Sequence, residues 1–267
     1  MVTWSLHQGD SLPWMAAMAD KSVDVCLCDP PYSEHVHGKT RRGGASAPPV
    51  DGAGRNPRSS YHRVQDLGFA SLSAETMTAA AAHLARLTRR WALVFCDVES
   101  SGSWQAALTA AGLDHVRIGA WVKLGSTPQF TGDRPAHGFE TIVMAHPKGK
   151  KRWNGGGHAA VYTHPIVLER GGQSAGRDGY RVHTTQKPLS LMIELVSLFS
   201  DPGETILDPF AGSGTTGCAA LRLGRHFVGA EMDPAYHAVA VERLTAEAAG
   251  TTLQAMLGGQ LTLGGAR

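Results

Sequence analysis

The stretch TILDPFAGSGTT, residues 205–216, decides the fold of this chain. Its first four residues predict a strand that ends at Asp208, the next few predict a tight turn, and a helix is expected to begin at Thr215. Small residues in such a turn let the backbone approach a ligand, and the first N–H groups of the helix point toward the ligand's anionic end. The stretch therefore predicts a ligand site at the end of a strand in an α/β fold.

Glu231 closes the next apolar run, 19 residues beyond Gly212. A nucleotide-binding fold places at this distance a carboxylate that accepts hydrogen bonds from ribose hydroxyls. The turn reads FAGSG rather than the GxGxxG of dinucleotide enzymes, which weighs against a nicotinamide-dependent oxidoreductase. We therefore expect a nucleotide-type cofactor of another kind.

A second motif, DPPY at residues 29–32, follows an apolar run and resembles the amine-methylating tetrapeptide of N-methyltransferases, which implies chemistry on an amine. An exocyclic amine of a base is a poor nucleophile because its lone pair is delocalised into the ring. The Asp29 side chain and the Pro30 carbonyl would accept its hydrogens and favour a pyramidal nitrogen. Pro30 and Pro31 restrict the backbone, and Tyr32 offers a ring on which a base extruded from a duplex can stack.

The remaining pattern alternates strands and helices in a chain of 267 residues. We expect strands over 23–28, 91–96, 117–123, 142–145, 205–208 and 227–230, and helices over 74–89, 103–111, 188–199, 215–223 and 234–248. Such alternation predicts a largely parallel sheet with helices on both faces. The length fits one domain, over residues 1–249, followed by a C-terminal tail at 250–267.

The net charge of +2 hides two basic segments, each with a local charge of +5, at 35–65 and 147–184. Both are rich in Gly, Pro and His, so they are interpreted as loops rather than core, and paired basic loops on an otherwise acidic body favour a polyanion-binding face. We expect the loops 33–68 and 147–184 to be insertions that bind a polyanion such as a nucleic acid. The candidate contacts are Lys39, Arg41, Arg42, Arg55, Arg58, Lys150, Lys151 and Arg152.

The four cysteines, Cys26, Cys28, Cys96 and Cys218, lie in or beside apolar segments. They are expected to act as small hydrophobic residues rather than as disulfides or metal ligands, and no metal site is predicted. The chain begins without a signal-peptide pattern and has no apolar run of membrane-spanning length, so a soluble cytoplasmic protein is expected.

Taken together, the motifs resemble the β class of amino-DNA methyltransferases, in which the DPPY motif precedes the motif for S-adenosylmethionine. The resemblance extends to Gly9-Asp10, to 121–123 and 138–140, and to HTTQKP at 183–188. It implies a Rossmann-like class I methyltransferase fold with catalytic residues Asp29, Pro30, Pro31 and Tyr32. It implies that S-adenosylmethionine is bound by Asp10, Asp29, His183, Lys187, Asp208, Phe210, Ala211, Gly212, Ser213, Gly214, Thr215, Glu231 and Met232. The region between Glu140 and His183 is short for a target recognition domain, so base recognition is expected to depend partly on loop 33–68 or on a second subunit.

The resemblance also implies the reaction, which is methylation of adenine N6 on a flipped-out base. Enzymes of this arrangement with Asp at the first motif position mostly modify adenine, whereas cytosine N4 enzymes mostly have Ser there, so Asp29 favours adenine and leaves cytosine N4 as the alternative. Cytosine C5 chemistry needs a cysteine nucleophile, typically after a proline, and no cysteine follows one here. RNA or protein-glutamine methylation and an inactive nucleic-acid-binding module remain open. The expected partners are double-stranded DNA, a second copy of the chain and a separately encoded restriction endonuclease.

Overall fold

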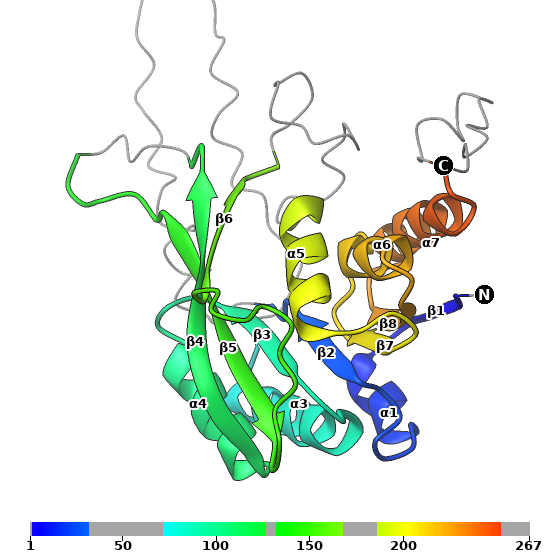
Figure 1. Ribbon diagram of the computed structural model, residues 1–267, viewed down its shortest axis with the longest axis horizontal. Coiled ribbons are helices and arrows are strands. Elements are labelled where there is room, and N and C mark those ends of the chain that lie inside the picture. The colour runs from blue at the N-terminus through cyan, green and yellow to red at the C-terminus, as the bar shows by residue number, and fades with distance from the viewer. Residues whose placement is uncertain (1, 32–71, 127–131, 168–185, 252–267) are drawn as a thin grey trace, which may run out of the picture.

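The structure is a computed structural model that describes residues 2–31, 72–126, 132–167 and 186–251 (Figure 1). Its centre is an eight-stranded sheet in the order β1-β8-β7-β2-β3-β5-β4-β6. The strands are β1 (Trp4–Gln8), β2 (Val25–Cys28), β3 (Ala92–Cys96), β4 (Leu113–Leu124), β5 (Phe139–Pro147), β6 (Val161–Pro165), β7 (Thr205–Asp208) and β8 (His226–Glu231). The helices are α1 (Ser11–Ala16), α3 (Ala74–Leu87), α4 (Ser101–Ala110), α5 (Leu189–Phe199), α6 (Thr215–Arg222) and α7 (Pro234–Ala248).

The sheet is largely parallel, as the alternation of elements predicted. Strand β5 runs antiparallel to both of its neighbours, β3 and β4, and every other pairing is parallel. The carboxyl ends of all strands except β5 therefore lie at one edge of the sheet, the upper edge in Figure 1. Ligands of open α/β sheets bind outside this edge.

Helices cover both faces of the sheet, which explains the unbroken apolar runs of its central strands. Successive residues of β2 and β3 point to opposite faces: Val25 and Leu27 pack in the cluster that contains α5 and α6, whereas Cys26 and Cys28 pack with α3 and α4. All four cysteines are buried free thiols, as predicted. The Rossmann-like architecture is thus confirmed. No helix in the described ranges has the length and apolar character needed to span a membrane.

Two of the predicted helix starts, at 74 and 234, are confirmed by their caps, whereas the helix predicted at 103–111 begins two residues earlier, at Ser101. The Ser73 side chain accepts a hydrogen bond from the Thr76 N–H at the start of α3. The Asp233 side chain accepts from the N–H groups of Ala235 and Tyr236 at the start of α7. Each cap satisfies N–H groups that the first helical turn leaves without a backbone partner.

Three elements were not predicted. β1 is a short edge strand of mixed exposure and α1 has six residues, so neither has a long enough apolar period to be recognised. β6 lies inside the segment 147–184 that was interpreted as loop, and this interpretation is wrong for 161–165, where Tyr162 is 1% exposed. The strand predicted at 142–145 is also longer and extends to Pro147.

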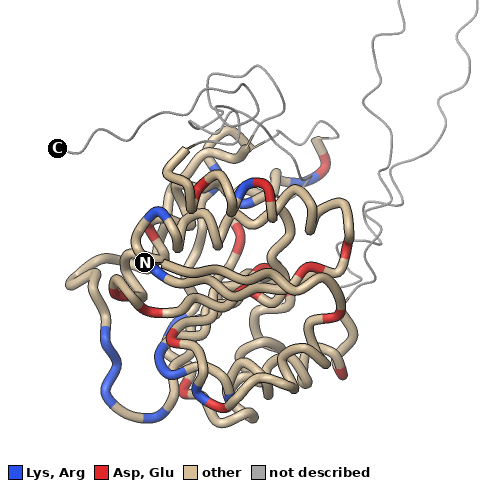
Figure 2. Tube along the Cα trace, turned by 90° about the vertical axis from the view of Figure 1, so that its right-hand side faces the viewer, with Lys and Arg blue, Asp and Glu red and all other residues tan. Residues whose placement is uncertain are grey.

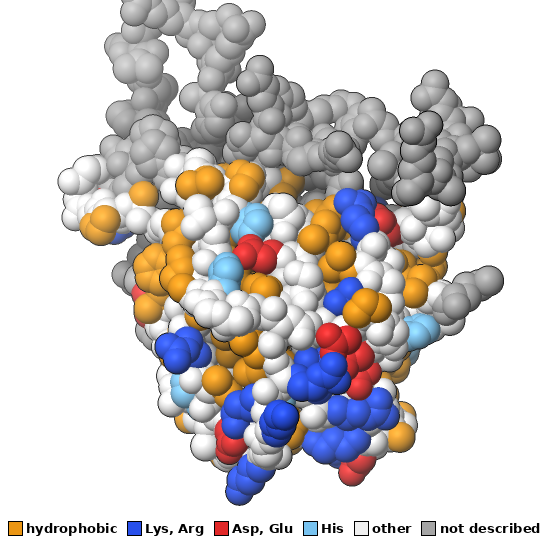
Figure 3. Space-filling model, viewed as in Figure 1, with side chains coloured by type: hydrophobic (Ala, Val, Ile, Leu, Met, Phe, Trp, Pro, Cys, Tyr) orange, Lys and Arg blue, Asp and Glu red, His pale blue; other side chains and the backbone are white. Residues whose placement is uncertain are grey.

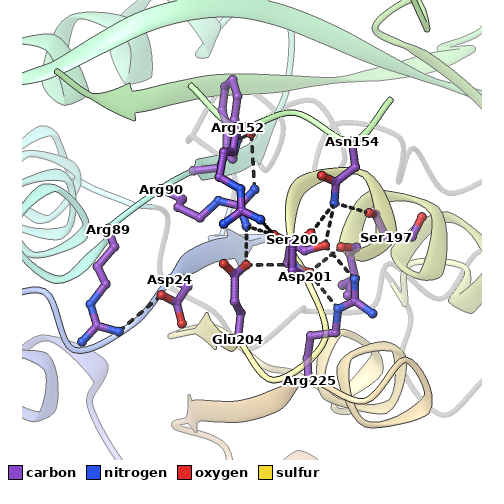
Figure 4. Close-up of polar contacts among 12 residues, drawn as sticks. Asp24, Arg89, Arg90, Arg152, Asn154, Ser197, Ser200, Asp201, Glu204 and Arg225 are labelled. Carbon is purple, nitrogen blue, oxygen red and sulfur yellow. Dashed lines mark hydrogen bonds and ion pairs between the residues drawn. The ribbon is translucent and has the colours of Figure 1, made fainter. Parts of the chain in front are cut away.

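A polar cluster closes the opposite, amino-terminal edge of the sheet (Figure 4). The Arg90 guanidinium lies 2.5 Å from a Glu204 carboxylate oxygen and 2.9 Å from one of Asp201. Arg152 lies 2.5 Å from the same Asp201 oxygen, and the Asn154 amide donates to the other. These contacts join the turn before β3, the β5–β6 connection and the α5–β7 turn. The cluster therefore links the two halves of the sheet.

We expect Arg90→Met to lower the free energy of unfolding by about 3 kcal/mol, because it leaves two partly buried carboxylates without their main cation. The matched control is Arg89→Met in the same turn, whose side chain is 52% exposed and pairs with Asp24 at 3.3 Å. Because the Arg89 guanidinium is exposed and its contact with Asp24 is longer, this pair is expected to contribute less, about 1 kcal/mol. Urea unfolding of both variants measures the difference, and equal losses would contradict the role assigned to Arg90.

Candidate active site

The carboxyl edge of the sheet gathers four acidic residues from distant parts of the chain. Asp29 follows β2, Asp208 ends β7, Glu231 ends β8 and Asp10 follows β1. Since β1, β8, β7 and β2 are consecutive in the sheet, the four residues follow one another along this edge. The pairing of Val25 with Ile206 and of Cys26 with Leu207 brings the two predicted motifs together.

The turn between β7 and α6 has the backbone that its glycines predicted. Gly212 has φ +53° and Gly214 φ +79°, both in the left-handed region. A Cβ atom on Gly214 would lie 3.1 Å from the Ala240 Cβ, whereas one on Gly212 would meet nothing within 4 Å. Gly214 is therefore needed for packing against α7, and Gly212 faces open space in which a ligand can approach the backbone.

Glu231 supports this turn from the neighbouring strand. One of its carboxylate oxygens accepts from the Gly212 N–H at 2.8 Å and the other from the Asp233 N–H at 2.8 Å. Burial raises the pKa of Glu231, against the lowering effect of these hydrogen bonds. Each carboxylate oxygen has a second lone pair, so the side chain retains capacity for ribose hydroxyls.

Asp208 shapes the turn from inside the protein. It is 3% exposed, and its carboxyl group accepts from the Phe210 N–H at 3.0 Å and from the Thr216 hydroxyl at 2.6 Å. Burial raises the pKa of Asp208 to about 7 even though both hydrogen bonds lower it. These contacts lie within the turn, so the predicted contact of Asp208 with a cofactor stays a prediction.

Arg243 of α7 also holds the turn, and sequence reasoning missed it. Its guanidinium donates to the Ser213 carbonyl at 2.6 Å, to the Ser213 hydroxyl at 2.9 Å and to the Thr215 hydroxyl at 3.2 Å. The side chains of Ser213 and Thr215 are therefore used within the protein, which leaves their backbone to a ligand. The available signal was a charged residue beside Ala240 and Leu244 on the buried face of α7.

The far end of the edge presents Asp10 and Met232. The Gly9 N–H donates to the Glu231 carbonyl at 3.0 Å, which sets Asp10 beside Glu231. Asp10 is exposed and caps α1 through the Leu12 N–H, and Met232 is 63% exposed. Open space at Gly212, a helix N-terminus, two carboxylates and an exposed thioether together suit S-adenosylmethionine, with its carboxylate, ribose and adenine.

Asp29 is held by Lys187, which the sequence had assigned to the cofactor. The Lys187 ammonium lies 2.5 Å from Asp29 Oδ2 and 3.0 Å from Glu140 Oε2. A second lysine, Lys123, lies 2.6 Å from Glu140 Oε1. Burial lowers the pKa of Lys187, but the charges of Asp29 and Glu140 more than offset this and raise it above its ordinary value. The site thus contains an ion network that spacing did not reveal.

The two cysteines near Asp29, Cys28 and Cys96, are buried in surroundings that disfavour their thiolate forms. A hydrogen bond with Cys26 and burial raise the pKa of Cys28 well above its usual value. Burial raises the pKa of Cys96 to about 12. This agrees with the prediction that cytosine C5 chemistry does not occur here.

The structure separates some predicted DNA contacts from this edge. Because β5 runs antiparallel to β3, its end at Pro147 lies at the amino-terminal edge, and Lys150, Lys151 and Arg152 follow there. On the face of the described residues that Figure 3 shows, Lys and Arg side chains gather mainly in the lower part, mixed with acidic side chains, and Figure 2 shows basic and acidic positions interspersed along the described trace. Lys151 pairs with Asp114 at 3.1 Å and Arg152 with Asp201 at 2.5 Å. These three residues therefore lie at the edge opposite to Asp29, and their predicted contact with DNA stays a prediction.

Several predicted site residues lie outside the described residues. They are Tyr32, His183, Lys39, Arg41, Arg42, Arg55 and Arg58, together with loop 33–68. Of the DPPY motif, the structure describes Asp29, Pro30 and Pro31 at the end of β2, with Asp29 beside Lys187.

This arrangement defines a transferase of the class I fold, with a nucleotide-type cofactor turn beside a carboxylate that can hold an amine. Residues 23–242 match the DNA methylase family. The chain therefore belongs to the N6/N4 DNA methylase family; it is a DNA methyltransferase and uses S-adenosylmethionine.

Known methyltransferases are similar to this chain in sequence or in fold. The chain is 26% identical to the Type II methyltransferase M.HinfI of Haemophilus influenzae over 90% of this chain and 68% of that protein. It resembles the crystal structure of the M1.HpyAVI–SAM complex, with TM-score 0.62 and 22% identity over 91% of this chain and 99% of the other. It also resembles the cytosine-N4-specific PvuII DNA methyltransferase, with TM-score 0.64 and 15% identity over 97% and 95%.

We expect Gly212→Asp to weaken binding of S-adenosylmethionine by about 100-fold, because the new carboxylate would face the carboxylate of the ligand. Gly112→Asp is the matched control, since Gly112 also has positive φ and open space at its Cβ position but precedes β4 at the opposite edge. Isothermal titration calorimetry measures both affinities. Unchanged affinity in a folded Gly212→Asp variant would remove the turn from the cofactor site.

Proposed function

We propose that this DNA methyltransferase modifies adenine N6 at specific sites of double-stranded DNA, in the manner of the β class with a DPPY motif. The observation that carries the proposal is the place of Asp29, at the end of β2, directly beside the FAGSG turn on β7. The catalytic motif precedes the cofactor motif in the chain, as in that class. Asp rather than Ser at the first motif position favours adenine.

The proposed roles follow from the chemistry of the target amine. S-adenosylmethionine supplies the methyl group in electrophilic form. Asp29 and the Pro30 carbonyl accept the hydrogens of the amine and free its lone pair, Pro30 and Pro31 fix that geometry, and Tyr32 stacks on the flipped base. The amine would acquire a positive charge as it gains the methyl group, whose bond to the sulfonium sulfur breaks to leave a neutral thioether. It would then lose a proton, for which Asp29 is the proposed acceptor.

The proposed cofactor contacts are divided along the edge of the sheet. The backbone of residues 210–215 and the start of α6 receive the carboxylate, with Asp208 supporting the turn. Glu231 accepts the ribose hydroxyls, and Asp10 and Met232 contact the adenine. Lys187 and His183 belong to the segment that precedes α5, and calorimetric affinity of Lys187→Met for S-adenosylmethionine tests the part of this segment in cofactor binding.

Cytosine N4 methylation is the second candidate, because the PvuII enzyme named for that reaction shares the fold. The two reactions give different nucleosides.

We expect expression in a host without DNA methylation to produce N6-methyladenine, identified by mass spectrometry of digested DNA. Asp29→Ala should lower turnover by about 100-fold or more while cofactor and DNA still bind, because the lost acceptor acts mainly in the transition state. Asp24→Ala is the control, since Asp24 precedes the opposite end of β2. N4-methylcytosine as the product would reverse the choice of base, and near-normal turnover of Asp29→Ala would refute its role.

The position of Lys150 and Lys151 allows the two basic segments to be tested separately. We propose that loop 33–68 contributes most phosphate contacts, so Arg41→Gln/Arg42→Gln should reduce the salt slope of DNA binding by roughly 0.9 for each lost contact. Lys150→Gln/Lys151→Gln should leave the slope unchanged, because these lysines lie at the edge opposite to Asp29. Fluorescence anisotropy over a range of salt concentrations measures both slopes. A reduced slope for the lysine variant and an unchanged slope for the arginine variant would instead indicate that DNA binds at the edge opposite to Asp29.

The proposal also includes a homodimer, a separately encoded restriction endonuclease and a cytoplasmic location. The homodimer would give each active site a second subunit for base recognition, as the short segment between Glu140 and His183 suggests. The homodimer and the endonuclease rest on the family resemblance.

A further inference from the structure

We propose that Lys187 is a positioning residue for the methyl transfer. It holds Asp29 as an ionised and correctly oriented acceptor, and Glu140 weakens the ion pair between Lys187 and Asp29. The inference rests on the proposed function. It concerns the network of Asp29, Lys187, Glu140 and Lys123, which four separate parts of the fold bring together.

The network alternates in sign and is almost closed to solvent. Lys187 side-chain exposure is 6%, that of Glu140 is 8% and that of Lys123 is 18%. Asp29 is the most exposed member at 22%, and it is the end of the network that faces the carboxyl edge. Two cations and two carboxylates give a neutral group, so the network adds no net charge to the site.

Two aromatic rings form the apolar surroundings of the Lys187 ammonium. It lies 5.1 Å from the centroid of Phe95 and 5.9 Å from that of Trp121. The Trp121 indole N–H donates to the His164 carbonyl at 3.2 Å, which fixes the ring. Because the Lys187 side chain is almost closed to solvent, its ammonium donates to the oxygens of Asp29 and Glu140.

Stability alone does not explain such a network. A buried ion pair contributes little compared with well-packed apolar residues, because both charges lose their hydration. The position of Lys187 does explain it, since an ammonium 2.5 Å from Asp29 Oδ2 keeps that carboxylate ionised and limits its rotation. A carboxylate has about four lone-pair sites, so Asp29 can bind Lys187 and still accept from the target amine.

Glu140 competes with Asp29 for the same ammonium. It lies 3.0 Å from Lys187 and is itself held at 2.6 Å by Lys123. An ammonium shared between two carboxylates stabilises the negative charge of Asp29 less than an ammonium bound to Asp29 alone. The geometry therefore predicts opposite effects when Lys187 or Glu140 is neutralised.

Other titratable groups surround Asp29, and the test keeps them unchanged. They are Cys28 on β2, Cys96 on β3 and Asp208 on β7, and the charge of Asp29 contributes to the raised pKa of each after larger effects of burial or hydrogen bonding. Comparisons among variants that all retain these groups isolate the effect of Lys187 and Glu140.

The experiment measures formation of N6-methyladenine by Lys187→Met, Lys187→Arg and Glu140→Gln across pH, together with calorimetric affinity for S-adenosylmethionine. We expect Lys187→Met to lower kcat by about 100-fold through loss of orientation, with cofactor affinity unchanged. Its acid limb of kcat/KM should move up by about one pH unit because Asp29 loses its counter-charge. Lys187→Arg should recover much of the activity, and the acid limb of Glu140→Gln should move down.

Two further variants serve as controls. Lys187→Met/Glu140→Gln keeps the charges of the network balanced, and it is tested in the same way if the single variant does not fold. Arg222→Met removes a comparably close pair, 2.5 Å from Glu247 between α6 and α7, outside the active site, and should leave kcat and the acid limb unchanged.

Other outcomes would overturn the inference. Loss of cofactor affinity in parallel with activity would make Lys187 a cofactor ligand, and an unmoved acid limb would make its role purely structural. Full activity of Lys187→Met in an enzyme whose native form makes N6-methyladenine would refute the inference alone. Absence of N6-methyladenine from the native enzyme would instead refute the proposed function.

Discussion

The parallel pairing of β2 with β7 is the constraint on which the site depends. It aligns Val25 with Ile206 and Cys26 with Leu207, and so places Asp29 and the turn after Asp208 at adjacent points of one edge. Residues far apart in the chain become neighbours because both strands end in the same direction. Helices on both faces exclude water from the strands, which makes a displaced register costly.

Buried charged side chains then fix the loops that this pairing brings together. Arg243 ties the cofactor turn to α7, Lys187 ties Asp29 to Glu140, and Arg90 ties the α5–β7 turn to the start of β3. Each one bonds to groups from another element. Loops that would otherwise depend on weak surface contacts are therefore held by charge-assisted hydrogen bonds with defined geometry.

The direction of β5 separates the two ends of the molecule. As β5 alone is reversed, Glu140 at its start reaches the active edge while residues 148–152 beyond its end reach the opposite edge. In the described part of the basic segment, Lys150, Lys151 and Arg152 therefore lie at the edge opposite to Asp29. Lys151 and Arg152 form ion pairs with Asp114 and Asp201.

The sequence by itself determined the α/β class, the strands and helices around both motifs, and the residues that end β2, β7 and β8 at the active edge. These features follow from local causes: apolar periodicity, helix caps at Ser73 and Asp233, and glycines with positive φ in the turn. Only the tertiary structure decided that Lys187 binds Asp29, that Arg243 binds Ser213, and that Lys150 lies far from the catalytic edge. These outcomes depend on strand order and direction, which bring together residues as far apart as Asp29 and Lys187, and no local pattern specifies that order.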